Sequence, residues 1–361
     1  MGVHSVFVKD AVRIPTRRAI VDLPDRQSFP TLTDVARAAG VSTATVSRCL
    51  NTSGKVSGAT RERVMRAVET LGYTPNFGAR ALAAKRTFTI GAIIPTMENA
   101  IFARGLQAFQ ETLHDKGYTL LVSSTAYRPD REAEQIRTLV ARGADGLLLI
   151  GYERDPEIYD FLRSRRVPVL LAWAHQTGNP HPAVGFDNRG AMAALTRAVL
   201  AHGHTAIAVI SGILRGNDRA SERLAGIRGV LQENGLDPHA LPVIETAYDI
   251  DNGARAFATL MQACDRPTVV MCVNDVLAAG AMQQARAMGI AVPEEVSITG
   301  FDDIELARLV TPQLTTVHVP HRQMGSLAAR ELVRMVETKG EGVSHELQSA
   351  LRLRASLGRR G

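Results

Sequence analysis

The side chains best suited to contact a nucleic acid lie in one stretch, residues 31–51. It combines several hydroxyl side chains and one arginine with apolar residues at helical spacing, and Gly40 divides it into two segments. Because glycine adopts a left-handed backbone conformation without steric cost, we expect Gly40 to end a first helix, with Thr33 as its N-cap. Ser42 is expected to cap a second helix. Two short helices joined by such a turn form a helix-turn-helix.

The second helix of this pair is expected to turn its polar face toward DNA. Val46, Cys49 and Leu50 repeat with the helical period and are predicted to face the core. In a helix-turn-helix the start of this helix meets base edges in the major groove. Arginine pairs bidentately with guanine, and threonine or alanine offers hydroxyl or thymine-methyl contacts. The side chains predicted to face outward are Thr43, Ala44, Ser47 and Arg48.

The amino-terminal quarter also carries the positive charge of the chain. The formal net charge of the 361 residues is +6, yet residues 1–87 contain 14 Lys and Arg against 6 Asp and Glu, and the remainder contains 28 against 30. A basic segment on a near-neutral body favours an anionic partner, and a basic solvated tail is the alternative interpretation.

The pattern changes from residue 88 onward. Apolar runs of strand length alternate with helical stretches in two successive rounds, over residues 89–173 and 189–300. This alternation is typical of parallel sheets covered by helices on both faces, and two rounds predict two doubly wound subdomains. Such folds bind ligands at the carboxyl ends of their strands or in the crevice between the halves.

The pattern T-x-x-D-V-A-x-x-A-G-V-S-x-x-T-V-S-R-x-L-N over residues 31–51 resembles the helix-turn-helix of the lac-repressor (LacI) family of bacterial transcription regulators. Leu71-Gly72-Tyr73 and Pro75-Asn76 follow in the family's spacing, and the resemblance covers about residues 30–355. It implies a small all-α helix-turn-helix DNA-binding domain. It further implies an α/β, periplasmic-binding-protein-like effector domain of two doubly wound subdomains.

The resemblance also implies which residues contact DNA. Base reading would fall to Thr43, Ala44 and Arg48, although relatives often carry a longer polar residue in place of the alanine, which leaves the operator sequence open. Leu82, in a segment that resembles the family's hinge helix, would wedge between base steps in the minor groove. A flexible linker is the alternative for that segment. The complete expected DNA-binding set is Thr31, Ser42, Thr43, Ala44, Thr45, Ser47, Arg48, Asn51, Ser57, Thr60, Asn76, Leu82 and Ala83.

The same resemblance implies an effector site in the crevice between the subdomains. Polar groups and aromatic walls in these positions suit a small polyhydroxylated ligand, a sugar or a sugar acid. A structural ion pair is the alternative role for Arg223, core packing for Trp173, and a surface position for Tyr248. The expected effector-binding residues are Phe102, Trp173, Asp187, Arg223, Tyr248, Asn274 and Asp302.

The expected domain organisation follows from these segments. Residues 1–28 are expected to be a disordered basic extension, and residues 75–87 a hinge helix or linker. The helix-turn-helix domain is expected at 29–74, the effector N-subdomain at 88–188 plus 319–348, and the C-subdomain at 189–318 plus 349–361.

Several function classes are excluded or disfavoured. No apolar run approaches the ~20 residues needed to cross a bilayer, which excludes an integral membrane protein. No secretory signal is apparent, and the three cysteines form no C-x-x-C pair, so we expect a cytoplasmic protein. Dinucleotide, P-loop, nucleophile-elbow and zinc-protease motifs are missing, so we expect no enzyme, cofactor or metal.

We therefore expect a homodimeric repressor of a carbohydrate-utilisation operon. It would bind a near-palindromic double-stranded operator, respond to a sugar or sugar acid, and have no membrane partner. An activator or dual regulator is the alternative within this class, and a solute-binding transport protein is the alternative from another class.

Overall fold

The computed structural model describes residues 29–51, 56–74, 81, 86–98 and 100–360. Its chain divides into two compact units, Met1–Arg80 and Ala81–Gly361. The expected extension at residues 1–28 lies outside the described residues, as does most of the expected hinge at 75–87. Among the predicted DNA contacts, this applies to Asn76, Leu82 and Ala83.

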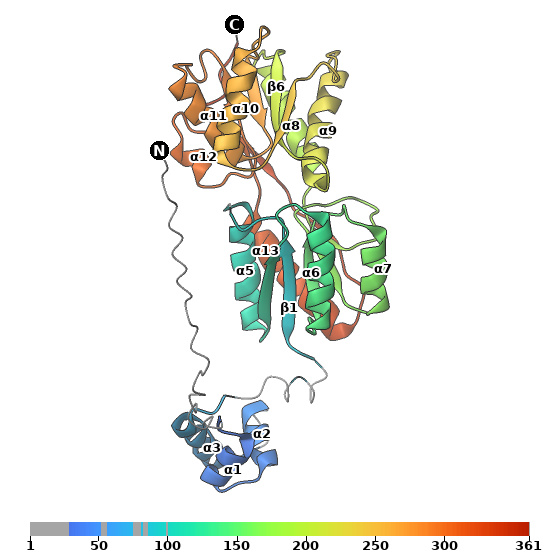
Figure 1. Ribbon diagram of the computed structural model, residues 1–361, viewed down its shortest axis with the longest axis vertical. Coiled ribbons are helices and arrows are strands. Elements are labelled where there is room, and N and C mark those ends of the chain that lie inside the picture. The colour runs from blue at the N-terminus through green and yellow to red at the C-terminus, as the bar shows by residue number, and fades with distance from the viewer. Residues whose placement is uncertain (1–28, 52–55, 75–80, 82–85, 99, 361) are drawn as a thin grey trace, which may run out of the picture. The chain divides into compact units, whose positions relative to one another are not determined.

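The first unit contains three described helices around a small core (Figure 1). They are α1 (Leu32–Ala39), α2 (Thr43–Asn51) and α3 (Gly58–Leu71). The buried side chains that pack between them are Val35, Ala36, Ala39, Val46, Cys49, Val64, Ala67 and Tyr73. These side chains recur at helical spacing on each helix, so burial of one face per helix holds the unit together.

The N-cap of α1 differs from the prediction. Thr31, not Thr33, begins this helix, and its hydroxyl accepts a hydrogen bond from the Asp34 amide at 3.3 Å. The Asp34 carboxylate accepts one in return from the Thr31 amide at 2.9 Å. This reciprocal capping box satisfies two backbone donors, which a cap at Thr33 would leave open. The helix ends at Gly40 in a left-handed conformation, as predicted.

The second unit begins with a parallel six-stranded sheet in the order β11-β5-β4-β3-β1-β2. Its strands are β1 (Thr89–Ile94), β2 (Thr119–Ser124), β3 (Gly146–Ile150), β4 (Val169–Ala172), β5 (Ala183–Gly185) and β11 (His345–Glu346). Helices α5 (Ala100–Asp115) and α13 (His321–Thr338) pack together on one face. Helices α6 (Pro129–Ala141) and α7 (Pro156–Ser164) cover the other. This layered body is called the N-subdomain below.

A second parallel sheet, in the order β7-β6-β8-β9, forms the C-subdomain. Its strands are β6 (Ile207–Gly212), β7 (Val243–Thr246), β8 (Val269–Cys272) and β9 (Ser297–Thr299). The helices pack in two pairs, α8 (Asn188–Ala201) with α9 (Asp218–Glu233), and α10 (Ile250–Gln262) with α11 (Asp275–Ala287). The short α12 (Leu306–Leu309) contacts α11. Strands β6 and β8 are buried along their whole length, as expected of strands covered on both faces.

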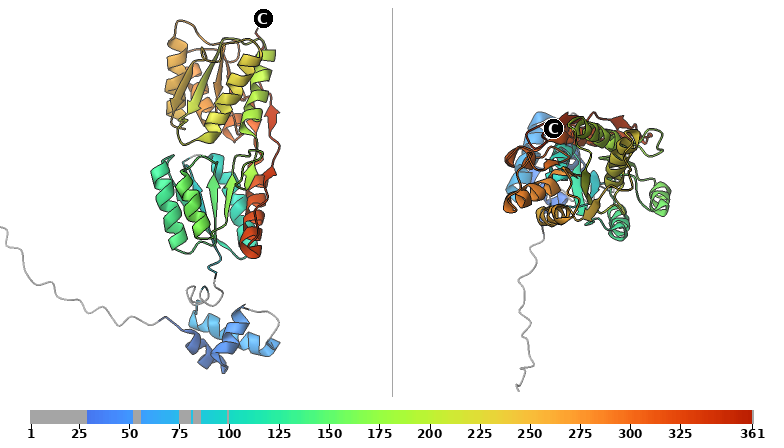
Figure 2. Two further views of the ribbon diagram at one scale, coloured as in Figure 1. Left: turned by 90° about the vertical axis from the view of Figure 1, so that its right-hand side faces the viewer. Right: turned by 90° about the horizontal axis from the view of Figure 1, so that it is seen from above.

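The carboxyl-terminal segment joins both subdomains (Figure 2). After β10 (Thr316–His318), the chain crosses into α13 of the N-subdomain and then adds β11 beside β5. It returns as β12 (Ala350–Arg352), which pairs antiparallel with β10. None of the described helices has the length and apolar character that a membrane crossing requires.

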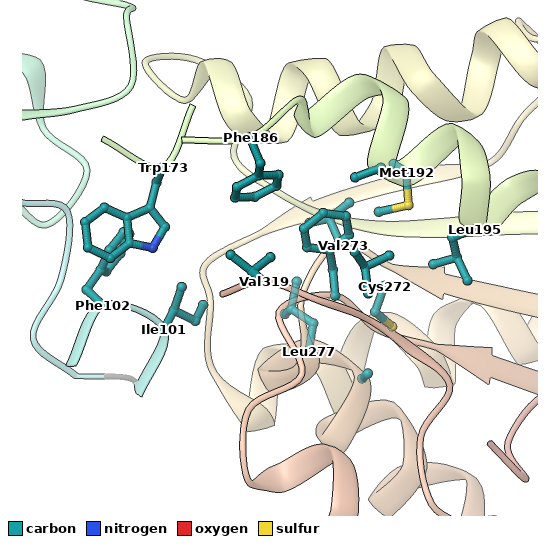
Figure 3. Packing of buried hydrophobic residues seen from close by; sticks show 14 of the residues in the cluster. Ile101, Phe102, Trp173, Phe186, Met192, Leu195, Cys272, Val273, Leu277 and Val319 are labelled. Atoms are coloured by element: carbon teal, nitrogen blue, oxygen red, sulfur yellow. The ribbon is translucent and has the colours of Figure 1, made fainter. Parts of the chain in front are cut away.

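One hydrophobic cluster continues from the N-subdomain into the C-subdomain (Figure 3). Phe102 and Trp173 lie at one end, near Ile101, and Phe186 and Val319 link them to the side chains of the second sheet. The elements that border the crevice are therefore supported by a common core.

Candidate nucleic-acid interface and ligand crevice

The buried face of α2 determines which of its side chains are presented outward. Val46 and Cys49 are fully buried against α1 and α3, as predicted, whereas Leu50 is half-buried. Thr43, Ala44 and Arg48 are exposed on the opposite side, and Ser47 is half-buried. The first two turns of α2 thus present a short alanine, hydroxyl groups and one guanidinium on one accessible face.

Hydroxyl side chains from the predicted DNA-binding set lie at helix N-termini. The Thr45 amide donates to the Ser42 hydroxyl at 3.2 Å, so Ser42 caps α2 as predicted. Ser57 stands at the N-cap position of α3, and its hydroxyl donates to Thr60 Oγ1 at 2.9 Å. Thr31 occupies the same position on α1. Backbone amides at helix N-termini bind anions, so these ends are suited to DNA phosphates. Asn51 is the last residue of α2.

Arg223 lies on α9 of the C-subdomain, and its side chain is almost fully buried. Its Nε donates to Asn188 Oδ1 at 2.9 Å, and its Nη1 donates to the Val273 carbonyl at 2.7 Å. Its Nη2 reaches Asp302 Oδ1 at 3.4 Å. The guanidinium also stacks over the Phe301 ring, 3.7 Å from the centroid. These contacts hold the Arg223 side chain in place. The pair with Asp302 is the structural ion pair that was the alternative to an effector-binding role.

Two polar atoms beside Arg223 lack partners within the described part of the chain. Asp302 and Asn274 have no exposed surface, yet neither Asp302 Oδ2 nor Asn274 Nδ2 has a hydrogen-bond partner there. Asn274 uses its other side-chain atom, Oδ1, to cap α11 by accepting from the Leu277 amide at 2.9 Å. Buried polar groups are normally satisfied, so an unpartnered oxygen on the carboxylate that pairs with Arg223 and an unpartnered nitrogen on the residue after Val273 are candidate partners for a polar ligand.

The predicted aromatic walls fall into two groups. Phe102 and Trp173 are both buried and meet nearly edge to face, with ring centroids 5.3 Å apart. They form part of the core that supports the crevice. Tyr248 is half-buried, and its hydroxyl accepts a hydrogen bond from Asn217 Nδ2 at 3.2 Å. Asp187 is exposed and caps α8 through the Gly190 amide, and it lines a cavity of about 450 Å³ together with Asn188 and Arg219.

Hydrogen bonds connect Trp173 to Arg223 through residues that the sequence did not single out. Asn188 Nδ2 donates to the Trp173 carbonyl at 3.0 Å, while its Oδ1 accepts from Arg223. His321 lies between the Trp173 indole and the Asp302 carbonyl, at 3.2 and 3.3 Å. The adjacency of Asn188 to Asp187 was the only sequence signal for this arrangement.

Further contacts across the crevice come from the start of α9. Arg219 Nη1 donates to the Ile150 carbonyl at 3.2 Å and pairs with Asp218 at 2.8 Å. The second carboxylate oxygen of Asp218 accepts from the Tyr152 amide. The sequence pattern did not single out Asp218, Arg219 or Tyr152.

Asp275 is a buried carboxylate outside the ligand-facing group. Its oxygens accept from the Thr316 hydroxyl at 2.6 Å and from the Ile304 amide at 2.8 Å. Burial, and then the proximity of Asp302, raise the pKa of Asp275 well above its usual range. Asp275 thus braces the loop that carries Asp302. No three His, Cys, Asp or Glu side chains among the described residues are grouped so that they could hold a metal ion.

Two family profiles match the chain: bacterial regulatory proteins of the lacI family over residues 31–76, and the periplasmic binding protein-like domain over residues 196–357. The chain is 33% identical to the HTH-type transcriptional repressor PurR of Vibrio atlanticus over 313 residues, which cover 86% of this chain and 92% of that protein. It is 32% identical to catabolite control protein A of Priestia megaterium over 304 residues, which cover 84% and 92%.

Solved structures are similar over most of the chain. The lac repressor dimer bound to operator and an anti-inducer superposes with a TM-score of 0.80 at 26% identity, covering 91% of this chain and 99% of that one. A complex of the regulator CelR with cellobiose superposes with a TM-score of 0.67 at 30% identity, covering 91% and 99%.

Proposed function

This chain belongs to the lacI family of bacterial regulatory proteins, and from that premise we propose the residues through which it reads DNA and senses its effector. It is a DNA-binding transcriptional repressor, not an enzyme, and it acts as a homodimer on operator DNA. Its effector is a small molecule bound by the periplasmic-binding-protein-like domain. We place its action in the cytoplasm, where the DNA is.

The DNA-reading surface that we propose is the exposed face of α2. Thr43, Ala44 and Arg48 face outward over the buried Val46 and Cys49, which fix their direction. Two such helices in a two-fold symmetric dimer would contact two half-sites, so the operator would be near-palindromic. The hydroxyl groups at the starts of α1, α2 and α3 would contact phosphates and set the register.

The effector that we propose is a sugar or a sugar acid of a carbohydrate-utilisation pathway. The observation that carries this proposal is the pair of orphaned buried atoms, Asn274 Nδ2 and Asp302 Oδ2, beside the fixed guanidinium of Arg223. One is a donor and the other an acceptor, and hydroxyl groups can satisfy both. A carboxylate cannot donate to Asp302, so a sugar acid would present its hydroxyls there.

Ligand binding would be coupled to DNA binding through the angle between the two subdomains. Couplings of this kind amount to ~1–3 kcal/mol and are reciprocal, so the operator changes effector affinity as much as the effector changes operator affinity.

Thermal unfolding of the purified protein tests the effector assignment. The panel comprises D-glucose, D-gluconate, cellobiose and guanine, because a ligand at about 100 times its Kd adds ~2.7 kcal/mol to the native state. We expect a stabilising sugar or sugar acid to lose its effect in Asp302→Asn and to keep it in Arg197→Ala. Arg197 pairs with Glu233 on the surface, so Arg197→Ala is the control for loss of an exposed ion pair. A compound that stabilises Asp302→Asn as much as the unaltered protein contradicts the assignment.

A further inference from the structure

Two tyrosine rings meet across the crevice from opposite subdomains. Tyr127 lies in the loop after β2 of the N-subdomain, and Tyr248 lies just before α10 of the C-subdomain. Their ring centroids are 5.4 Å apart, and the rings are inclined by 47°. Tyr248 is one of the expected effector-binding residues, whereas Tyr127 is not.

Tyr248 is fixed by its own subdomain. Its hydroxyl accepts from Asn217, and its ring fills the space above Gly212, where a Cβ on Gly212 would collide with it. The ring therefore has a defined position, and an effector that packs on Tyr248 must approach the part of the ring that faces the crevice.

Tyr127 is held by a strained piece of loop. Ala126 and Tyr127 both adopt left-handed backbone conformations, with φ of 52° and 57°. Residues with a Cβ adopt this region at a cost, and two in succession need surrounding contacts to hold them. One contact is the Tyr127 amide, which donates to the Pro95 carbonyl at 3.3 Å. The other is the ring of Tyr248.

The distance between the rings leaves no space for a ligand between them. Two rings that sandwich a sugar need about 7–8 Å, because each face contacts the ligand at roughly 3.5–4 Å. The cavity that borders Tyr127, between Ile94, Thr125 and Arg219, measures about 30 Å³. That volume accommodates one or two water molecules but not a sugar. The larger cavity that borders Tyr248, about 540 Å³, lies on its other side, next to Glu98 and Ile304.

The phenol of Tyr127 also lies within the electrostatic reach of the proposed effector site. Burial, and next the adjacent Tyr248, raise the pKa of Tyr127 above its usual range. The charges of Arg219, Asp302 and Arg223 act on the same hydroxyl.

We propose that Tyr127 is a built-in occupant of the part of the effector crevice next to Arg219, and that an effector that approaches the Tyr248 ring from that side must displace it. The loop would act as a tethered competitor, and the apparent effector affinity would be reduced by the fraction of molecules in which the ring is in place. The identity of the ligand rests on the proposed function, but the contact between the two rings does not.

The first test needs no effector. Trp173 is the only tryptophan, it has 1% of its surface exposed, and it is linked to Arg223 through Asn188. We expect acrylamide to quench Trp173 fluorescence more strongly in Tyr127→Ala, by roughly twofold in the quenching constant, because the crevice opens more often. Tyr127→Phe keeps the ring and should match the unaltered protein. Arg128→Ala, in the same loop but exposed, is the control. Unchanged quenching in Tyr127→Ala overturns the proposal.

The second test separates a competitor from a wall of the site. For a panel sugar that stabilises the unaltered protein, titration calorimetry should show roughly twofold to tenfold tighter binding to Tyr127→Ala, which is the value of an aromatic pair contact. Weaker or unchanged binding overturns the proposal. If no panel compound binds, the effector assignment fails, and the quenching experiment still decides the role of Tyr127.

Discussion

Trp173 Nε1 donates a hydrogen bond to Nδ1 of His321 at 3.2 Å. The other ring nitrogen of His321 faces the carbonyl of Asp302 at 3.3 Å. An imidazole that accepts at one nitrogen must be neutral, because a protonated ring has only donors. His321 is the first residue of α13, where the chain re-enters the N-subdomain. A neutral histidine thus joins the indole of one subdomain to the backbone of the other.

This arrangement predicts a loss of stability on the acid side. Burial lowers the pKa of His321, and the nearby Arg223 and Arg104 act in the same direction, while Asp302 opposes them. Because the folded pKa lies below the unfolded value of about 6.5, the unfolded chain takes up the proton first. The stability that neutral His321 adds to the folded protein is fully present above pH ~6.5. It is lost as the pH falls from there toward the pKa of His321 in the folded protein.

The measurement is the free energy of urea unfolding at pH 7.5 and pH 5.5. We expect the drop between these values to be smaller in His321→Gln, whose amide does not titrate. Burial lowers the pKa of His204 too, so part of the drop should persist in this variant. An identical drop in both proteins would show that His321 is not held neutral by its surroundings.

Arg48 should govern sequence discrimination. Its exposed position on α2 predicts that Arg48→Ala lowers the preference for operator over scrambled DNA by ~1–3 kcal/mol, through loss of a base contact. Thr60→Ala should instead weaken binding to both DNAs alike, because we assign this residue to phosphate contact. Fluorescence anisotropy at one fixed salt concentration measures both ratios. Equal discrimination by Arg48→Ala and the unaltered protein would remove Arg48 from the base-reading set.

Arg219 should stabilise the closed arrangement of the two subdomains. Its guanidinium is 9% exposed, and it connects Asp218 to the Ile150 carbonyl. Arg219→Met leaves the Asp218 carboxylate without its cation, so we expect the effector domain to lose about 1.5–3 kcal/mol. Urea unfolding checks this value, with Arg197→Met as the exposed control. A loss no larger than in the control would mean that the crevice does not depend on this contact.

Thr31 should contribute to the stability of the helix-turn-helix unit. Thr31→Ala removes the capping box at α1 and should cost about 1 kcal/mol, whereas Thr33→Ala, at the second position of the helix, should cost much less. The helical signal in thermal unfolding compares the two variants directly. A larger loss of stability in Thr33→Ala than in Thr31→Ala would show that Thr33 is the N-cap of α1.

The sequence predicted the alternation of elements well because each element carries its own signal. The second round of alternation, expected over residues 189–300, begins with α8 at Asn188–Ala201 and β6 at Ile207–Gly212. The error at Thr31 arose because both threonines offer a capping hydroxyl and only the reciprocal bond to Asp34 distinguishes them.

The crevice was harder to predict because its contacts join distant parts of the chain. His321 meets Trp173 only once α13 has returned to the first sheet, and nothing local to His321 indicates this. Tyr127 lies in a loop, where no periodicity marks which way a side chain turns. Arg223 was identifiable through the family resemblance, whereas its partner Asn188 was not singled out.

The central claim, that a sugar controls how this dimeric repressor binds its operator, is tested most directly in two steps. The purified protein first selects duplexes from a random DNA pool. Fluorescence anisotropy then measures its affinity for the selected sites with the stabilising sugar present or absent. We expect the selected sites to be near-palindromic and the sugar to change affinity for them by a coupling of ~1–3 kcal/mol, with that change lost in Asp302→Asn. Selected sites without two-fold symmetry, or a full sugar response in Asp302→Asn, would contradict it.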